Sequence, residues 1–346
     1  MLHRTLALPL HRAAQRAMLV LLQGPRGAGK TTLLRRELPG HTYVALDDQR
    51  DRARARAAPE RFLASLRGAA LVDDAHRAPE LVAYLAASPP PNPLVLASAH
   101  RLVLPAAETL ELHRPTRAER QRRPPLPLEM LGRFAPSVTH SPGGPVTWPV
   151  TWPVPWPEPR SFLDLDVREL VRLHDVDRFE AFLRAARDRT GHWLDQQALA
   201  NECGVAHRTV VRWLAVLDTC FLTLTLPPTS QDFGRRTVRR PKLHFLEHAH
   251  FESEVVSEIY RNAHHTGDPP NLRHWRDSNG FAIPLIIESE TALPVPVVIA
   301  PQPTPADLAG LRRWMSLAGT PHGAVIGLTK PAARSANVLR YSLAEL

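Results

Sequence analysis

Cysteine, lysine and long apolar runs are all scarce in this 346-residue sequence, and each scarcity excludes a class of protein. The two cysteines, Cys203 and Cys220, have no partner Cys or His at metal-ligand spacing. They are therefore expected to be reduced, buried thiols rather than a disulfide framework or a zinc site. The apolar run Met18–Leu22 is far too short for a membrane span or the core of a signal peptide. We expect a soluble, cytoplasmic chain with no membrane partner.

Only three of the 43 basic residues are lysines: Lys30, Lys242 and Lys330. A GC-rich genome explains such an arginine-rich vocabulary, so we give the abundance of arginine no functional weight. The net charge of +9 and the isoelectric point of about 10.4 favour polyanionic partners. A solvated basic surface would explain the same composition.

The first 115 residues alternate short apolar runs with helical stretches, which is typical of βα units on a parallel sheet. Strands are expected at Met18–Gln23, Thr42–Leu46, Ala69–Asp73, Leu94–Ala97 and Thr109–Leu112. Helices are expected at Lys30–Leu38, Pro59–Leu66 and Pro79–Ala86. The pattern predicts an α/β P-loop domain over residues 1–120.

Three further segments follow. Residues 121–160 are rich in proline, with tryptophans at 148, 152 and 156, and predict an extended linker whose rings pack on the protein itself or dock on a partner. Residues 161–246 predict helices and a winged helix, with one helix over Phe162–Leu173 and strands at Phe221–Leu226 and Pro241–Leu246. Residues 247–346 predict a small α/β domain, with helices at Phe251–Arg261 and Pro305–Leu317 and strands at Ile283–Glu288, Pro294–Ile299 and Gly323–Leu328.

A phosphate-binding motif follows the first expected strand. Residues Gly24-Pro25-Arg26-Gly27-Ala28-Gly29-Lys30-Thr31-Thr32 satisfy the pattern G-x-x-x-x-G-K-[ST] between a strand and a helix. The glycines let backbone N–H groups converge on phosphate oxygens at the start of the helix. Lys30 would contact the outer phosphates, and the Thr31 hydroxyl would be a ligand of Mg²⁺. A chain that otherwise uses arginine keeps lysine here, where a broad guanidinium would not fit.

Two carboxylates end the expected strand Ala69–Asp73. Asp73 would support the metal, and Asp74 would orient the attacking water. Asp74 is one methylene shorter than the glutamate expected at its position, which predicts slow hydrolysis.

Together these segments resemble the prokaryotic AAA-type ATPases that carry a DUF4143 C-terminal region. The resemblance rests on Gly24–Thr32, Tyr43–Asp48, Val72–Leu81, Phe162–Leu170, Arg208–Val210 with Trp213-Leu214, and Pro241–Phe245 with Phe251-Glu252. It implies an AAA-like ATPase core, a winged helix and a C-terminal domain of restriction-endonuclease-like fold, and it is the basis for expecting adenine rather than guanine. The sequence departs from the family pattern at two further positions. The polar sensor of the family is reduced to one hydroxyl, that of Ser98, and Ala106-Ala107 stand where a charge-sensing arginine is expected. Arg77 and Arg101 are possible arginine donors to a neighbouring subunit.

A helix-turn-helix is predicted by Asp195–Glu202, a turn at Cys203–Val205, and Ala206–Leu217. Its core would contain Leu199, Val205, Val210, Leu214 and Leu217, leaving His207, Arg208 and Arg212 outside. The following hairpin carries Arg235, Arg236, Arg239, Arg240 and Lys242, where a wing would contact phosphates. Packing with a solvated basic face is the alternative to DNA binding.

The C-terminal domain lacks the acids that a nuclease needs. The resemblance places acids where Ala282 and Pro284 stand, and an acid and a lysine where Val298 and Ala300 stand. Metal-dependent cleavage of a phosphodiester needs clustered carboxylates, which Glu252 and Glu288 alone do not supply. We expect no nuclease activity. The dense histidines His248, His250, His264 and His265 lack ordered ligand spacing and predict no metal site.

The sequence therefore predicts a slow ATPase that uses ATP and Mg²⁺, with duplex DNA and self-association as possible partners. A nucleotide-gated switch that binds DNA or protein, with negligible turnover, is the alternative. A third interpretation is a decayed paralogue that only binds its ligand.

Overall fold

A computed structural model of the chain describes residues 2–126, 176–231, 233, 237–247, 250–289, 292–329 and 337–346. The chain divides into two compact units. Unit 1 comprises Met1–Pro125, Leu217–Leu222 and Tyr260–Pro269. Unit 2 comprises Leu126–Val216, Thr223–Ile259 and Pro270–Leu346. The predicted linker beyond residue 126, the predicted helix Phe162–Leu173, His248, Arg235 and Arg236 lie outside the described residues.

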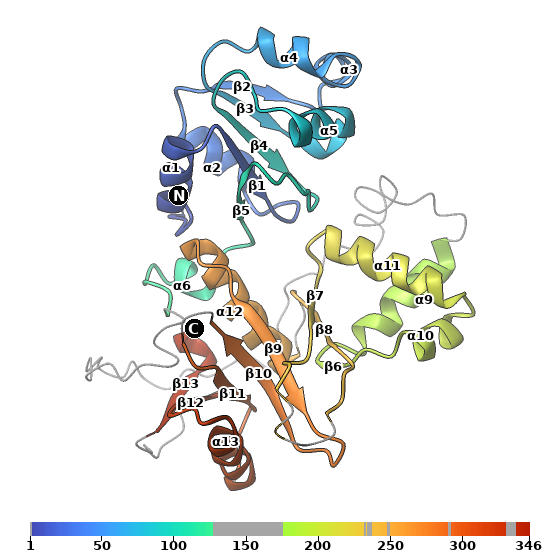
Figure 1. Ribbon diagram of the computed structural model, residues 1–346, viewed down its shortest axis with the longest axis vertical. Coiled ribbons are helices and arrows are strands. Elements are labelled where there is room, and N and C mark those ends of the chain that lie inside the picture. Colours follow the sequence, from blue (N-terminus) through green and yellow to red (C-terminus); the bar gives the residue numbers. More distant parts are fainter. Residues whose placement is uncertain are drawn as a thin grey trace. The chain divides into compact units, whose positions relative to one another are not determined.

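A parallel five-stranded sheet forms the centre of unit 1 (Figure 1). Its strands are β1 (Leu19–Gln23), β2 (Thr42–Ala45), β3 (Ala70–Asp73), β4 (Leu94–Ser98) and β5 (Glu108–Glu111). Their order is β2-β3-β4-β1-β5, so β4 lies between the strand that precedes the P-loop and the strand that ends in Asp73. The predicted α/β architecture of this part of the chain is confirmed.

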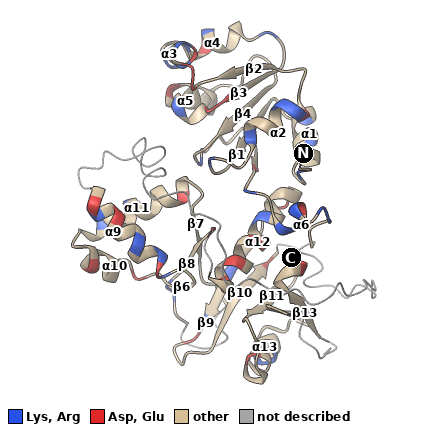
Figure 2. Cartoon of the chain, turned by 180° about the vertical axis from the view of Figure 1, so that it is seen from behind, with Lys and Arg blue, Asp and Glu red and all other residues tan. Residues whose placement is uncertain are grey.

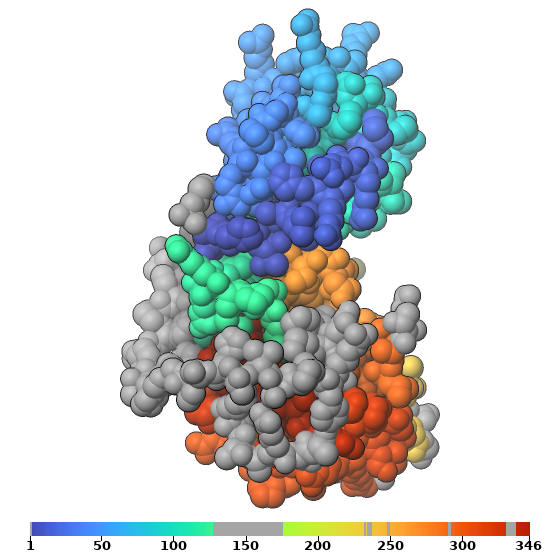
Figure 3. All heavy atoms as spheres, turned by 90° about the vertical axis from the view of Figure 1, so that its left-hand side faces the viewer, coloured from blue at the N-terminus to red at the C-terminus, as the bar shows by residue number. Residues whose placement is uncertain are grey.

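Helices cover both faces of this sheet, as Figure 1 shows. They are α1 (Ala7–Arg16), α2 (Lys30–Glu37), α3 (Gln49–Ala57), α4 (Pro59–Ser65), α5 (Pro79–Ala87) and the 3₁₀ turn η1 (Ala75–Arg77). The short helix α6 (Arg117–Arg120) follows β5 and lies away from the faces of the sheet. Side chains alternate across β1, so Leu19 and Leu21 join the core under α3–α5, while Val20 and Leu22 join the core under α1 and α2. Helix α1 contacts α2, and the first residues of the chain, dark blue in Figure 3, lie at the surface of this unit on the face shown.

Local signals explain where several helices begin. Asp48 caps α3 by accepting hydrogen bonds from the backbone N–H groups of Arg50 and Asp51. Pro59 and Pro79 open α4 and α5, where a missing N–H costs nothing. Helices α1 and α3 were not predicted from the sequence.

The first part of unit 2 contains three helices and a small antiparallel sheet. These are α9 (Val176–Arg187), β6 (His192–Trp193), α10 (Gln196–Cys203), α11 (His207–Thr219), β7 (Thr223–Leu226) and β8 (Lys242–Phe245), with strand order β6-β8-β7. The ring of Trp213 packs against two phenylalanines, with centroid distances of 5.3 Å to Phe179 and 5.1 Å to Phe182. Basic and acidic residues are interspersed along these helices (Figure 2).

The second part of unit 2 is a mixed five-stranded sheet. Its elements are α12 (Phe251–Thr266), β9 (Asn271–Arg276), β10 (Ala282–Glu288), β11 (Val295–Ile299), α13 (Pro305–Ala318), β12 (Gly323–Gly327), β13 (Val338–Ser342) and the 3₁₀ turn η4 (Leu343–Glu345). The strand order is β13-β12-β11-β10-β9. Strand β10 pairs antiparallel with both β9 and β11, whereas β12 pairs parallel with both β11 and β13. Helix α12 is longer than predicted, and its end, from Tyr260, belongs to unit 1.

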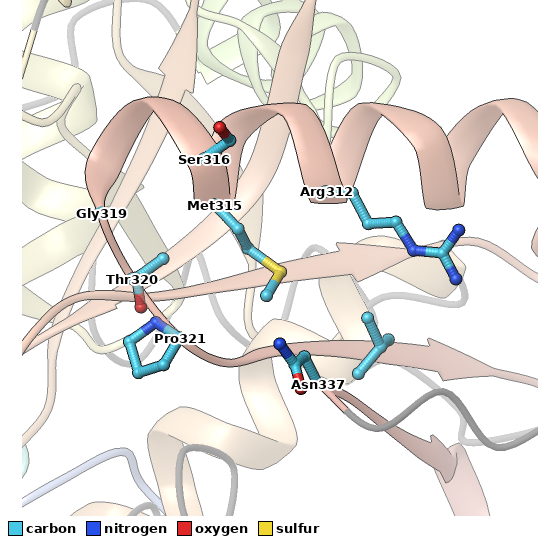
Figure 4. A pocket seen from close by; sticks show the side chains of 8 residues that line it. Arg312, Met315, Ser316, Gly319, Thr320, Pro321 and Asn337 are labelled. Atoms are coloured by element: carbon cyan, nitrogen blue, oxygen red, sulfur yellow. The ribbon is translucent and has the colours of Figure 1, made fainter.

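An open cavity of about 550 Å³ lies between the end of α13 and the start of β13 (Figure 4). Arg312, Met315, Thr320 and Asn337 are among the residues that line it. None of the predicted site residues borders it. Among the described residues, no helix has the length and apolar character needed to cross a membrane.

Candidate nucleotide site

The loop from Gly24 to Gly29 connects β1 to α2, as the motif requires. Gly27 and Gly29 have φ angles of 78° and 92°, in the left-handed region that glycine enters at little cost. Gly24 has a φ of 153°, and a Cβ atom at this position would lie 1.9 Å from the carbonyl oxygen of Leu112. Gly24 is thus required by close backbone approach, and the P-loop is held against the segment that follows β5.

The ammonium of Lys30 lies within this loop. Its Nζ is 2.8 Å from the carbonyl oxygen of Gly24 and 3.0 Å from that of Pro25, and the residue is only 7% exposed. A buried cation encircled by loop backbone suits the binding of phosphate oxygens.

Two residues predicted to support a metal are brought together. The Thr31 hydroxyl donates a hydrogen bond of 2.5 Å to Oδ2 of Asp73, across the space between α2 and β3. The backbone N–H of Asp74 donates to the other carboxylate oxygen, Oδ1, at 2.9 Å. A hydroxyl beside a carboxylate is the hard oxygen donor set that Mg²⁺ prefers, so the residues present fit the predicted ion.

Tyr43 also contacts Asp73, although it was not predicted from the sequence as a site residue. Its hydroxyl donates to Oδ2 of Asp73 at 3.0 Å, and Arg35 lies over its ring at 3.9 Å. Burial and the neighbouring Asp73 charge raise the pKa of Tyr43 to about 12, so it remains a donor at neutral pH. Its signal was its place on the strand that pairs in register with the Asp73 strand.

Asp74 follows directly and has a φ of 56°, a left-handed conformation that Asp tolerates better than most residues. Its Oδ2 lies 3.8 Å from Nε of Arg77. Burial, and secondarily the charge of Asp73, raise the pKa of Asp74 above its ordinary value. A raised pKa makes the carboxylate a better proton acceptor, which suits the orienting of a water molecule.

The hydroxyl of Ser98 at the end of β4, the one remaining hydroxyl at the expected position of the polar sensor, is engaged by the backbone of His100. Its Oγ donates to the carbonyl oxygen of His100 at 2.6 Å and accepts from the backbone N–H of His100 at 3.1 Å. Instead, the rings of His76 and His100 lie 4.4 Å apart beyond this strand. Burial, and then the nearby His100, lower the pKa of His76 to about 3, so His76 is neutral at physiological pH. These histidines carried no motif that could have identified them.

A second polar cluster lies at the end of β5, in unit 1. The Glu111 carboxylate accepts from Arg101, from the Tyr260 hydroxyl at 3.0 Å and from His113 Nε2 at 3.2 Å, and His264 lies 3.6 Å away. Glu111, His113 and His264 place one ligand atom each within 4.8 Å of one another, so this set could hold a metal ion. The guanidinium of Arg101 already neutralises the carboxylate, and we interpret the cluster as a structural network.

Arg101 was also considered as an arginine donor to a neighbouring subunit. Its Nε lies 3.7 Å from Asp218, and its guanidinium stacks 4.4 Å from the centre of the Phe221 ring. All of these partners belong to unit 1, like Arg101 itself. Of the two arginines considered, Arg77 remains beside Asp74.

The predicted helix-turn-helix corresponds to α10 and α11. Asp195 caps α10, Gly204 adopts a left-handed φ of 62° at its end, and Leu199 and Val210 are buried. Val205 and Leu214 are half-buried rather than part of the core. His207, Arg208 and Arg212 are exposed, as are Arg239 and Arg240.

Two basic residues of the hairpin already have protein partners. Arg240 forms an ion pair of 2.8 Å with Asp195. Lys242, predicted to contact phosphates from the wing, is instead only 5% exposed and forms a 2.5 Å ion pair with Glu252. The expectation for Lys242 was wrong because its side chain points into unit 2, where a buried charge requires a partner.

The acids of the C-terminal region have separate partners. Glu252 pairs with Lys242, whereas Glu288 accepts from the Thr229 hydroxyl at 2.6 Å and from the Asn271 amide at 3.2 Å. Ala282 and Pro284 lie on β10, Val298 lies on β11 and Ala300 directly follows it. Within the described part of unit 2, no group of three His, Cys, Asp or Glu side chains has ligand atoms close enough to share a metal ion.

Two family models match the chain. A model described as AAA domain matches residues 16–102, which include the P-loop and the Asp73-Asp74 pair. This match and the parallel sheet support an AAA-type P-loop domain with a nucleotide-binding role. A model described as Domain of unknown function (DUF8612) matches residues 159–251, in the part where the resemblance implied DUF4143.

The curated proteins that are similar carry no described activity. Uncharacterized protein Rv2008c of Mycobacterium tuberculosis and Uncharacterized protein Mb2031c of Mycobacterium bovis are each 31% identical over 262 residues. The match covers 70% of this chain, and the chain spans 57% of the length of each relative. No solved structure matches.

Proposed function

We propose that this chain binds ATP with Mg²⁺ at the junction of β1, α2 and β3 and hydrolyses it slowly. The observation that carries the proposal is the 2.5 Å hydrogen bond between Thr31 and Asp73, beside the buried ammonium of Lys30. Two separate segments, the start of α2 with Lys30 and Thr31 and the end of β3 with Asp73, thereby converge in the arrangement that a phosphate-bound metal needs. The match to an AAA domain over the same residues supports adenine as the base.

Each predicted residue has a distinct part in this proposal. The backbone N–H groups from Arg26 through Thr32, including those of Gly27, Ala28 and Gly29, would surround the phosphates, and Lys30 would neutralise the outer ones. Gly24 and Pro25 would shape the start of the loop, since Pro25 has no N–H and that of Gly24 donates to the Ser98 carbonyl. Thr31 and Asp73 would hold Mg²⁺, which when bound withdraws charge from the phosphate oxygens. Tyr43 would orient Asp73, and Asp74 would orient the attacking water.

Two observations favour slow turnover. The carboxylate of Asp74 is one methylene shorter than a glutamate, which leaves its reach toward a water molecule short. The Ser98 hydroxyl is engaged by the backbone of His100 and would not contact the terminal phosphate. These same observations favour the second candidate function, a nucleotide-gated switch in which occupancy matters and turnover is incidental.

A further part of the proposal concerns the remainder of the chain, for which the DUF4143 resemblance remains our hypothesis. Helices α10 and α11 with strands β6–β8 would form a winged helix, and the exposed Arg208, Arg212 and Arg239 would contact DNA phosphates. Arg235, Arg236 and the Asp195-paired Arg240 complete the proposed basic set. The final sheet would be a nuclease-like scaffold without activity, because its acids are dispersed.

The test is steady-state ATP turnover with Mg²⁺, measured with and without duplex DNA, in the wild type and in Lys30→Ala. We expect turnover that Lys30→Ala reduces at least about 100-fold, since it removes the charge on the outer phosphates. Arg16→Ala, an exposed arginine of α1 ion-paired with Glu108, is the control and should retain turnover. A rate that rises with DNA would support the winged helix as a sensor.

Three outcomes are distinguishable. Turnover that persists in Lys30→Ala would contradict the proposed site. Absent turnover with ATP binding that depends on Lys30 would favour the switch. Absence of both turnover and nucleotide binding in the wild type would overturn the proposal as a whole.

A further inference from the structure

Arg4 is a buried cation that touches the P-loop from outside the motif. Its Nη1 donates a 2.7 Å hydrogen bond to the carbonyl oxygen of Ala28, and the residue is only 6% exposed. A Cβ atom placed on Gly29 would lie 3.6 Å from the same Nη1, so the guanidinium lies against the last peptide before α2. Nothing in the phosphate-binding pattern indicates a residue so far upstream.

The guanidinium is held by three partners at once. Nη2 donates to the carbonyl oxygen of His113 at 2.5 Å, and Nε lies 3.2 Å from Oε2 of Glu119. Glu119 is itself fixed, because it accepts from the backbone N–H groups of Thr5 at 2.8 Å and Thr116 at 3.1 Å. Although burial alone would raise the pKa of Glu119, a hydrogen bond with His265 and the charges nearby, including Arg4, lower it to about 2. The carboxylate therefore stays ionised opposite Arg4.

The hydrogen bond to Ala28 has a consequence on the other side of the peptide. In a trans peptide the carbonyl and the following N–H point in opposite directions. Holding the Ala28 carbonyl toward Arg4 thus directs the Gly29 N–H away from Arg4. Gly29 precedes α2, where a backbone N–H is a ready anion donor. Because glycine has no Cβ atom, it restricts the orientation of the preceding peptide less than other residues do, so a contact that holds this peptide has an effect.

We propose that Arg4 is a positioning residue of the nucleotide site, which presets the Gly29 N–H as a phosphate donor by clamping the Ala28 carbonyl. This inference rests on the proposed nucleotide binding and adds to it a residue outside the motif. A donor that is already oriented costs no ordering when phosphate binds, so Arg4 increases affinity without touching the ligand. Only a guanidinium can serve, because its planar fork reaches Glu119, His113 and Ala28 together, whereas an ammonium is a single point charge.

The test measures ADP affinity and ATP kinetics in Arg4→Ala and Arg4→Lys, with Arg16→Ala as the matched control. Arg16 also pairs with a glutamate in unit 1, Glu108, but it is exposed and forms no hydrogen bond with the described loop Gly24–Gly29. We expect the Kd for Mg²⁺-ADP to rise about tenfold or more in both Arg4 variants, as for a lost hydrogen bond to a charged ligand. KM for ATP should rise by a similar factor with kcat within about threefold, since the donor serves ground and transition states alike.

A structural role alone would have a different signature. It would lower Tm without nucleotide, and ADP affinity measured well below each variant's Tm would stay within about twofold of wild type. That result overturns the inference, as does an equal loss in Arg16→Ala. Where Arg4→Ala fails to fold, Glu119→Gln replaces it, because this variant keeps the shape of the side chain but removes the charge that anchors Arg4. It should give a smaller rise in the Kd for ADP. Unchanged ADP affinity in folded Glu119→Gln and Arg4→Lys would contradict the inference. A wild type that binds no ADP instead refutes the proposed function itself.

Discussion

Two adjacent carboxylates at the end of β3 differ in what holds them. Asp73 accepts hydrogen bonds from Thr31, Tyr43 and the backbone of Asp74, so its orientation is set by three separate segments. Asp74 lies in a left-handed turn with Arg77 at 3.8 Å, and burial beside Asp73 raises its pKa. The first arrangement suits a metal ligand and the second suits a group that acts on water.

Asp74→Asn separates the two candidate functions. In an ATPase, loss of the carboxylate should reduce kcat by about 100-fold or more, because a positioned proton acceptor contributes on that scale. Binding of ADP should stay within about threefold, because the proposal assigns Asp74 to the attacking water and not to the phosphates. Rapid-quench turnover and equilibrium binding would measure the two quantities.

The exposed Asp47→Asn, which removes a carboxylate elsewhere in unit 1, is the control. If Asp74→Asn leaves cellular function intact while Lys30→Ala removes it, the switch is favoured. A variant with unchanged kcat would contradict the role assigned to Asp74.

At the scale of elements, the P-loop depends on the segment that follows β5. Strands β1 and β5 pair in parallel, and the backbone N–H of Leu112 donates to the carbonyl of Gln23 at 2.8 Å. This contact brings the Leu112 carbonyl against Gly24, where no side chain fits. The loop is therefore braced by the strand beside it as well as by its own glycines.

Gly24→Ala and Gly27→Ala should differ sharply. A Cβ atom on Gly24 would lie 1.9 Å from a backbone oxygen, so the loop or β5 must move, and we expect nucleotide binding to be lost with a stability cost of about 3 kcal/mol or more. A Cβ atom on Gly27 meets nothing within 4 Å, leaving only the left-handed backbone cost of about 1–2 kcal/mol. Chemical unfolding and ADP binding on both variants would measure this, and equal effects would count against the bracing.

At the scale of the whole molecule, unit 1 gathers several neutral histidines in its interior. Burial, partly offset by Glu111, lowers the pKa of His113 to about 3 and that of His264 to about 4. Burial and His100 lower that of His76 to about 3. The ordinary pKa of histidine is about 6.5, so unfolding below that pH takes up protons.

Stability should therefore fall on acidification. Between pH 6.5 and about 4 the unfolded chain binds a proton at each of these three histidines and the folded chain does not, so the free energy of unfolding decreases as pH falls. Each site contributes at most about 1.4 kcal/mol per pH unit in that window, and above pH 6.5 the contribution is complete. Denaturant unfolding from pH 7 to pH 5 would measure it.

His264→Gln should reduce the slope of stability against pH by up to about 1.4 kcal/mol per unit. Replacing the exposed His207 by Gln is the control and should leave that slope unaltered. A slope that is the same in wild type and His264→Gln would contradict the assignment of a buried neutral imidazole.

Much of the α/β architecture was readable from the order of the residues. Every expected strand of the first domain is present within a residue or two, because short apolar runs such as Leu94–Ser98 are bounded by clear turn signals. Helix α3 was missed because Gln49–Ala57 is dominated by arginine and alanine, and its cap at Asp48 was not recognised. Strands β9 and β13 were also missed.

Some residues of the candidate site could be predicted from the sequence, and others could not. Gly24–Thr32, Asp73 and Asp74 are recognisable from spacing, because each must occupy a fixed place at the end of a strand. Tyr43, His76, His100 and Arg4 are not, because they reach the site through strand pairing or from the far side of the loop.

The sequence by itself determined the P-loop, the parallel sheet and the carboxylate that ends β3, since local patterns of glycine, apolar residues and acids specify them. Only the tertiary structure decided that Arg4 clamps the loop, that Lys242 is buried against Glu252, and that Glu111 gathers Arg101 and three other side chains. The physical reason is that a buried charge must find its partner wherever the chain folds back on itself. Arg4 and Glu119 are 115 positions apart, a separation that no local pattern records.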